Sequence, residues 1–166
     1  MEIAKKLGLT DEIFARMVVK TKMLFSNVIG HAAELHYEKY LKSSKIDFIK
    51  AETDSHYDYI VDNKKEQVKR WESAGTNEKF LAINLTQTHG DRSGEGNFYH
   101  KKSFDKLVAY DVLFKSFKKF DINEIETNKR FEDYIVGKFK IQRESNNLLD
   151  NEQKEFLNLI KVKNKD

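Results

Sequence analysis

The stretch SHYDYIVDNKKEQVKRW, residues 55–71, decides which fold this chain can adopt. The β-branched and aromatic residues of YDYIV indicate a strand, the polar DNKK that follows is typical of a turn, and EQVKRW is expected to form a second strand. With the apolar-rich IDFIKAE at residues 46–52, the pattern predicts a β-hairpin over residues 46 to about 71. A strand that packs on a core has no evident use for an Asp, a Gln and a Lys, so these side chains need an explanation.

Alternation along the second strand separates its side chains into two faces. Gln67 and Lys69 then point one way, and Val68 points the other way, into the core. A turn near Asn63 brings Asp58 of the first strand back close to Gln67 and Lys69. One edge of the sheet would therefore gather a carboxylate, an amide oxygen and an ammonium group.

These three groups suit metal-assisted hydrolysis of a phosphodiester. Mg²⁺ prefers oxygen ligands, takes few of them from protein and keeps several waters, so Asp58 and the amide oxygen of Gln67 could each supply one ligand. Lys69 could orient or deprotonate a water, or stabilise charge on a phosphate under attack. The alternative from spacing alone is a cross-strand Asp58–Lys69 pair on a solvated face.

The segments outside the hairpin predict helices at both ends of the chain. Residues 10–44 have helical apolar spacing with Thr10 as N-cap, and Gly30 marks a break or a close approach, so two helices or one kinked helix are expected. Residues 122–139 and 150–163 also have helical patterns.

Further strands are expected between these helices. The segment 79–85 is apolar enough to be a central strand, 104–114 forms another, and KKFDI at 118–122 is a candidate for one more. The order of helix, strands and helices, with no internal repeat, predicts one α+β domain over residues 1–166.

Composition excludes several classes of protein. With no cysteine, the chain has no disulfide framework, no zinc–thiolate site and no cysteine nucleophile, and its five histidines lack zinc-site spacing. No apolar run is long enough to span a membrane and no signal-peptide pattern is present, so a cytoplasmic protein is expected. The net charge of +3 does not by itself indicate nucleic acid, although FKSFKKF and KVKNKD are basic patches interleaved with apolar residues.

The order of these motifs resembles the core of the PD-(D/E)XK nucleases, over about residues 28–112. In that family a helix with GxxAE and a following YL precedes a strand with Asp and a strand with (Glu or Gln)-x-Lys. The matching residues here are Gly30, Ala33, Glu34, Tyr40, Leu41, Asp58, Gln67, Val68 and Lys69. The QVK form is similar to small homing endonucleases encoded in group I introns and to some compact restriction enzymes.

The resemblance implies a restriction-endonuclease-like fold, α+β with an α/β-like core, in which helices flank a mixed central β-sheet. It also implies roles: Asp58 is the main metal ligand, Gln67 supplies a second oxygen, Lys69 acts on the attacking water, and Glu34 binds the metal directly or through water. Glu38 is a second candidate for the helix ligand. The implied cofactor is Mg²⁺, with Mn²⁺ able to substitute.

Two departures from the family pattern bear on the site. Tyr57 stands where the motif has Pro, and Gln67 stands where most members have an acid, which removes one negative charge from the metal site. A weakened site would leave a DNA-binding or junction-binding protein with a degenerate nuclease core. An interaction domain with a chance match is a third reading.

Six residues in and after the Gly-rich loop 88–97 suit contacts with phosphates or base edges, although a plain solvent loop is the alternative. They are Arg92, Ser93, Asn97, His100, Lys101 and Lys102. The expected partner is double-stranded DNA, cut at specific sites by a restriction or homing enzyme or processed by a Holliday junction resolvase. Because one site cuts one strand, a homodimer or dimer of dimers is expected.

Overall fold

The computed structural model describes residues 7–52, 55–70, 77, 79–86, 98–142 and 149–161. Its helices are α2 (Asp11–Lys20), α3 (Lys22–Ser43) and α4 (Asn151–Lys161), with a 3₁₀ turn η1 (Ile122–Glu124). Its strands are β1 (Phe48–Lys50), β2 (Tyr59–Val61), β3 (Lys64–Arg70), β4 (Phe80–Asn84), β5 (Lys106–Asp111), β6 (Ser116–Asp121) and β7 (Lys138–Gln142).

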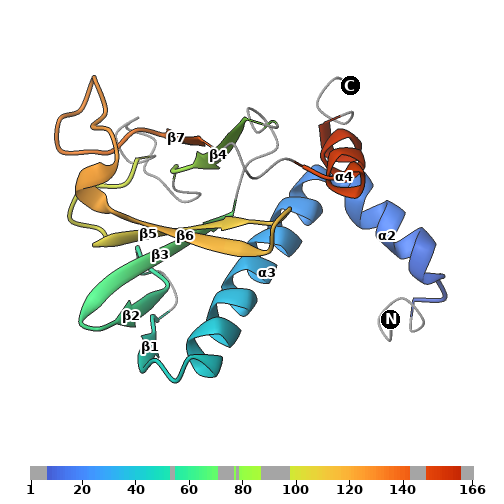
Figure 1. Ribbon diagram of the computed structural model, residues 1–166, viewed down its shortest axis with the longest axis horizontal. Coiled ribbons are helices and arrows are strands. Elements are labelled where there is room, and N and C mark those ends of the chain that lie inside the picture. The colour runs from blue at the N-terminus through green and yellow to red at the C-terminus, as the bar shows by residue number, and fades with distance from the viewer. Residues whose placement is uncertain are drawn as a thin grey trace.

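Five of these strands form the central sheet, in the order β1-β2-β3-β5-β6 (Figure 1). Strands β3 and β5 run parallel, and the other three pairs run antiparallel, so the sheet is mixed. Strands β4 and β7 pair in a second, two-stranded sheet. The predicted α+β class with a mixed central sheet and flanking helices is confirmed.

The predicted hairpin forms, with its turn at the expected place. Val61 pairs with Lys64, which leaves Asp62 and Asn63 as a two-residue loop. Both loop residues have positive φ, 49° and 59°, as a type I′ turn requires. Asp and Asn tolerate this left-handed region better than most residues, so the local sequence fixes both the turn and the register of the strands.

Helix α3 packs on one face of the central sheet, and the small sheet covers the other (Figure 1). Ala33, Tyr37 and Leu41 recur every four residues and are buried against the face of Val68 and Val108. The opposite face is buried in a second cluster with β4. The core residues of that cluster from β4 and β5 are Leu81, Ile83, Leu107 and Ala109.

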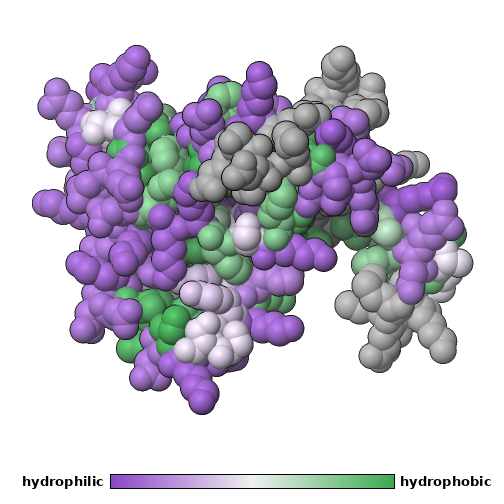
Figure 2. Space-filling model, viewed as in Figure 1, coloured by the Kyte–Doolittle hydropathy of each residue, from purple (hydrophilic) through white to green (hydrophobic). Residues whose placement is uncertain are grey.

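The surface in the view of Figure 2 is mostly hydrophilic, with smaller hydrophobic areas between the charged side chains. Within the described ranges no helix is both long and apolar enough to cross a membrane. The buried residues, by contrast, are almost all apolar, and the charged or amide exceptions are Glu66, Gln67 and Asp111. Glu66 and Gln67 are consecutive residues of β3, so this strand carries two of the three buried polar side chains.

Three expectations about the elements were wrong in detail. Residues 10–44 form two helices, as one of the two expectations had it, but the break is at Thr21, whose backbone is extended, and not at Gly30, which lies inside α3. The segment 79–85 forms β4 of the small sheet and not a central strand. Segment 122–139 is not a helix. There the Asn128 side chain accepts hydrogen bonds from the backbone N–H groups of Arg130 and Phe131, and these bonds compete with the hydrogen bonds of a helix.

Candidate active site

Asp58 directly precedes β2, and its side chain lies beside Gln67 and Val68 of β3. The Asp58 N–H donates to the Glu66 carbonyl at 2.9 Å, and its own carbonyl accepts from Ala51 N at 2.9 Å. One carboxylate oxygen, Oδ2, accepts from the Val68 N–H at 2.7 Å and from the Gln67 side-chain amide at 2.5 Å. The juxtaposition predicted from the hairpin therefore forms.

A pocket of about 350 Å³ surrounds these groups. All four residues predicted as catalytic line it: Glu34, Asp58, Gln67 and Lys69. Helix α3 contributes one wall, the β2–β3 hairpin another, and the end of β4 a third. The other lining residues are Asn27, Gly30, His31, Val68, Arg70, Asn84 and Thr86.

Glu34 reaches this pocket because of how α3 is fixed on the hairpin. The buried Tyr59 of β2 donates its hydroxyl to the Glu34 carbonyl oxygen at 3.3 Å. Glu38, the other candidate, instead pairs with Lys42 at 2.5 Å and with Lys50 at 3.7 Å. These two lysines lower the pKa of Glu38, and this residue is not among those that line the pocket. Of the two helix carboxylates, only Glu34 shares the pocket with Asp58.

The carboxyl group of Asp58 has an unusual titration for an aspartate. Burial raises its pKa from 3.8 to about 6, and the nearby Glu34 carboxylate raises it as well. The Val68 N–H, Lys69 and Lys50 act in the opposite direction and are outweighed. Asp58 is therefore held where its negative charge is poorly solvated and repelled by a second carboxylate.

Lys69 does not form the simple ion pair with Asp58 that spacing alone allowed. Its ammonium lies over the ring of Tyr99, 5.1 Å from the ring centroid. Tyr99 is 5% exposed and belongs to the core under the small sheet, so the ring is a fixed support. A cation–π contact of this kind attracts the ammonium group to the ring face and restricts its position in the pocket.

Gln67 is 5% exposed, and its amide nitrogen makes two hydrogen bonds. Its nitrogen donates to Asp58 and also to the Val68 carbonyl at 3.2 Å. In this arrangement the amide nitrogen, not the oxygen, faces Asp58. Rotation of the amide by half a turn would present the oxygen instead, which is the atom that a metal ion would bind.

A buried acid next to Gln67 had no role in the sequence reasoning. Glu66 is 1% exposed and lies on the other face of β3. It accepts a short hydrogen bond from the Tyr37 hydroxyl and pairs with Lys119 at 2.9 Å. Burial and this carboxylate raise the pKa of Tyr37. Glu66 therefore links α3, β3 and β6 beneath the pocket.

The residues predicted to contact DNA are only partly described. Arg92, Ser93 and Asn97 lie outside the described residues. His100 is half-buried against Tyr134, at 5.3 Å between ring centroids, and its Nδ1 accepts from the Lys102 N–H. Lys101 and Lys102 are exposed, and neither is among the residues that line the pocket.

Five polar lining residues were missed as site residues: Asn27, His31, Arg70, Asn84 and Thr86. Helical spacing could have indicated two of them, because His31 lies one turn and Asn27 two turns before Glu34. Asn84 and Thr86 come from a strand whose place in the fold the sequence did not reveal. The Asn84 side chain accepts from the Thr86 hydroxyl at 2.7 Å, which fixes both at the pocket.

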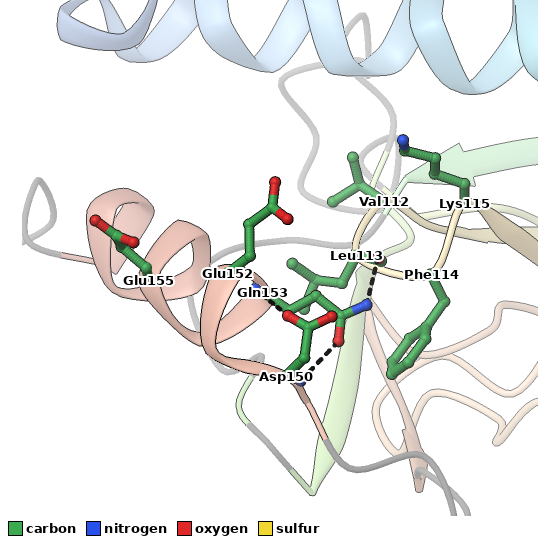
Figure 3. A pocket seen from close by; sticks show the side chains of 8 residues that line it. All are labelled: Val112, Leu113, Phe114, Lys115, Asp150, Glu152, Gln153 and Glu155. Atoms are coloured by element: carbon green, nitrogen blue, oxygen red, sulfur yellow. Dashed lines mark hydrogen bonds between the residues drawn. The ribbon is translucent and has the colours of Figure 1, made fainter.

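A larger hollow, of about 690 Å³, lies between the β5–β6 turn and α4 (Figure 3). Its polar groups mainly cap the helix. Gln153 and Asp150 exchange side-chain to backbone hydrogen bonds at 2.8 and 3.0 Å, and the Gln153 amide donates to the Leu113 carbonyl at 2.9 Å. These contacts fix α4 on the sheet, and none of the predicted catalytic residues lines this hollow.

The mixed sheet, the helix that carries Glu34 and the hairpin that carries Asp58 define an α+β protein with a nuclease-like fold. A solved structure with this fold is that of a bacterial homing endonuclease, I-Ssp6803I. The two align with a TM-score of 0.53 and 18% sequence identity, over 84% of this chain and 95% of that chain. No protein-family model matches the chain, and no curated protein matches it. At this identity the likeness shows the fold.

Proposed function

We propose that the protein is a Mg²⁺-dependent DNA endonuclease of the PD-(D/E)XK superfamily that hydrolyses phosphodiester bonds. The observation that carries this proposal is the convergence of Glu34, Asp58, Gln67 and Lys69 on one pocket. Glu34 lies on α3, Asp58 directly precedes β2, and Gln67 and Lys69 lie on β3. The spacing of the hairpin alone had selected the last three. The fold shared with a homing endonuclease supports the same conclusion.

The donor set fits a hard divalent cation. The two carboxylates, of Glu34 and Asp58, are close enough that one raises the pKa of the other, and a cation between them would remove this repulsion. Mg²⁺ commonly takes one or two carboxylates and keeps several waters, whereas the described residues contain no cluster of three or more acidic, histidine or cysteine ligands. The Gln67 oxygen is the third donor, and Mn²⁺ should substitute. When bound, the ion would supply charge neutralisation at the phosphate and a more acidic water.

The chain's own residues supply the other parts of the reaction. Held over the Tyr99 ring, the Lys69 ammonium is placed to stabilise negative charge that develops on the scissile phosphate. The same group can orient the attacking water by hydrogen bonding. The Val68 N–H and the Gln67 amide hold one oxygen of Asp58, which leaves its other oxygen for ligand binding.

Plasmid cleavage with Mg²⁺ or EDTA tests the proposal. Lys69→Ala and Asp58→Ala should each lower the cleavage rate by at least about 100-fold while the protein stays folded. The matched control is Lys65→Ala. Lys65 lies on the same face of β3 and its ammonium also lies over a tyrosine, Tyr57, at 5.3 Å, but it is not among the residues that line the pocket. Equal rates for Lys69→Ala and Lys65→Ala would remove Lys69 from the mechanism.

The amide is tested by titrating Mg²⁺ against rate. Gln67→Ala should raise the Mg²⁺ concentration needed for half-maximal rate, and Gln67→Glu should retain or strengthen metal binding, because it adds a charge to the ligand set. An unchanged Mg²⁺ requirement in the alanine variant would mean that Gln67 only packs.

A second candidate function is a DNA-binding or junction-binding protein that has lost catalysis. The observation that favours it is the Gln67 amide nitrogen, which already occupies an oxygen of Asp58. Such a protein would bind DNA equally well in EDTA and in Mg²⁺, and would cut in neither. Cleavage that depends on Mg²⁺ excludes this alternative.

Double-strand cleavage at specific sites, as in restriction or homing, would require two copies. Exposed apolar side chains on α2 and at the start of α3 support a homodimer or dimer of dimers on DNA. They are Ile13, Met17 and Val28, which are 52%, 39% and 46% exposed. Sedimentation with and without duplex DNA measures the assembly. A protein that stays monomeric on DNA and yet makes clean double-strand breaks would contradict it.

A further inference from the structure

A second pocket, of about 610 Å³, lies between α3 and the start of β6. Helix α3 and the strand segment each contribute four lining residues. They are His36, Lys39, Tyr40, Ser43, Lys115, Ser116, Phe117 and Lys119. This lining has three lysines, an imidazole, two serine hydroxyls and the rings of a tyrosine and a phenylalanine, and it contains no carboxylate. We define it as the basic pocket.

The basic pocket is separate from the candidate active site. Lys39 follows Gly30, and Ser43 follows Glu34, by roughly two and a half turns of about 3.6 residues each. Residues that are half a turn out of phase lie on opposite flanks of a helix. Because α3 packs on the central sheet through Tyr37, the two pockets flank this contact on its two sides.

Two of the three lysines keep an uncompensated charge. Lys119 is held by the buried Glu66 at 2.9 Å and lies over the Tyr37 ring at 5.2 Å. Lys39 and Lys115 are exposed and make no ion pair within the described part of the chain. The sequence FKSFKKF, which was singled out as a basic patch, thus contributes Lys115 and Lys119 to one concave site.

Aromatic rings form a firm wall beside these charges. His36 stacks on Tyr110 with 5.5 Å between centroids and 18° between planes. Phe117 contacts Tyr110 at 5.0 Å and Tyr40 at 6.1 Å. Tyr40 is nevertheless 44% exposed, so part of a large ring is open to a ligand.

The backbone at Lys115 is strained. Its φ is 50°, in the left-handed region where Gly is the favoured residue and where a Cβ atom crowds the following carbonyl oxygen. A lysine at such a turn position has a physical disadvantage for stability. Its presence beside Ser116 and opposite Lys39 is accounted for if its ammonium binds something.

We propose that the basic pocket binds a nucleotide, either free or as one residue of a nucleic-acid strand, through its phosphate and its base. Ammonium groups and hydroxyls are suited to phosphate oxygens, and an exposed aromatic ring suits stacking of a base. The volume lies in the range of small-molecule sites. The proposal does not depend on the candidate active site, which lies on the other flank of α3.

Calorimetric titration tests it with three probes: inorganic phosphate, AMP, and a single-stranded tetranucleotide with a 5′ phosphate. AMP or the tetranucleotide should bind saturably, and inorganic phosphate should bind at least tenfold more weakly because it cannot stack. Tighter binding of AMP identifies a free nucleotide, and tighter binding of the tetranucleotide identifies a strand. Equal binding of phosphate and AMP would overturn the stacking contact, and the absence of saturable binding by all three would overturn the site.

Variants locate the binding. The double change Lys39→Glu with Lys115→Glu should weaken binding of the better probe at least tenfold, and Tyr40→Ala should weaken AMP but not phosphate. The matched control is Lys64→Glu with Lys129→Glu, which makes the same charge change at exposed lysines outside both pockets. Equal loss in the control would show general charge attraction and overturn the proposal. Asp58→Ala should bind the probe as tightly as the unmodified protein does, which separates this test from that of the endonuclease.

Discussion

Asp58→Asn should make the metal-free protein more stable at neutral pH while removing its proposed activity. Burial and the Glu34 carboxylate raise the pKa of Asp58 from 3.8 to about 6 in the folded protein. The folded state therefore holds this proton more tightly than the unfolded state does. The stability that the protonated carboxyl contributes is complete below pH 3.8 and is lost as the pH rises through about 6.

The size of the effect follows from the two pKa values. The difference between 3.8 and about 6 corresponds to about 3 kcal/mol of unfolding free energy, which the unmodified protein loses between about pH 4 and pH 7. Asparagine keeps an oxygen that can accept from the Val68 N–H and the Gln67 amide. Because an amide oxygen replaces the charged carboxylate as acceptor, these hydrogen bonds weaken, and about 1 kcal/mol of the gain in unfolding free energy is lost. The net gain for Asp58→Asn at pH 8 is about 2 kcal/mol.

Urea unfolding in EDTA at several pH values between 4 and 8 measures this difference. The control is Asp47→Asn, since Asp47 is an exposed carboxylate in the loop before β1, and its replacement should change the unfolding free energy by less than about 0.5 kcal/mol. Parallel stability curves for Asp58→Asn and the unmodified protein would refute the reasoning. Millimolar Mg²⁺ should then stabilise the unmodified protein and leave Asp58→Asn unchanged, because ligand binding to the folded state raises stability.

Four further substitutions test the fold around the site by urea unfolding. Glu66→Ala should lower the unfolding free energy by about 2–4 kcal/mol, because it leaves the buried Tyr37 hydroxyl without its acceptor and Lys119 without its ion-pair partner. A loss below about 1 kcal/mol would contradict this. Asn63→Gly should stabilise by about 0.5–1 kcal/mol, since φ is 59° there, and destabilisation would argue against the type I′ turn. Gly137→Ala should lower the unfolding free energy by about 1–3 kcal/mol, because the new Cβ would lie 2.8 Å from a Phe98 ring carbon. At Gly30 a new Cβ meets nothing within 4 Å, so Gly30→Ala should stabilise the helix by up to about 1 kcal/mol. Equal effects of the two substitutions would contradict the packing.

The local part of the site could be read from the sequence. A two-residue turn and the strand period of two are enough to place Asp58 beside Gln67 and to send Val68 to the other face. Both outcomes depend on residues fewer than a dozen positions apart, so no distant contact is needed to decide them. The same holds for the helix start at Thr10 and for α4, whose patterns are local.

The course of segment 122–139 could not be read in this way. Its apolar residues have spacing compatible with a helix, but Ile125 and Ile135 are buried in the core of the small sheet. Local side-chain bonds, such as those of Asn128, and pairing with β4 outweigh helical propensity. The parallel pairing of β3 with β5 likewise joins segments far apart in the chain.

The sequence predicted that a hairpin would gather Asp58, Gln67 and Lys69, and it offered Glu34 as the helix carboxylate to join them, with Glu38 as a second candidate. Glu34 and Glu38 are one turn apart on α3, so periodicity cannot separate them. The tertiary structure decides because Tyr59 holds α3 at Glu34, while Lys42 and Lys50 bind Glu38 outside the pocket. The reason is physical: helical spacing fixes the face on which a side chain lies, and only packing on the sheet fixes which turn of that face meets the hairpin.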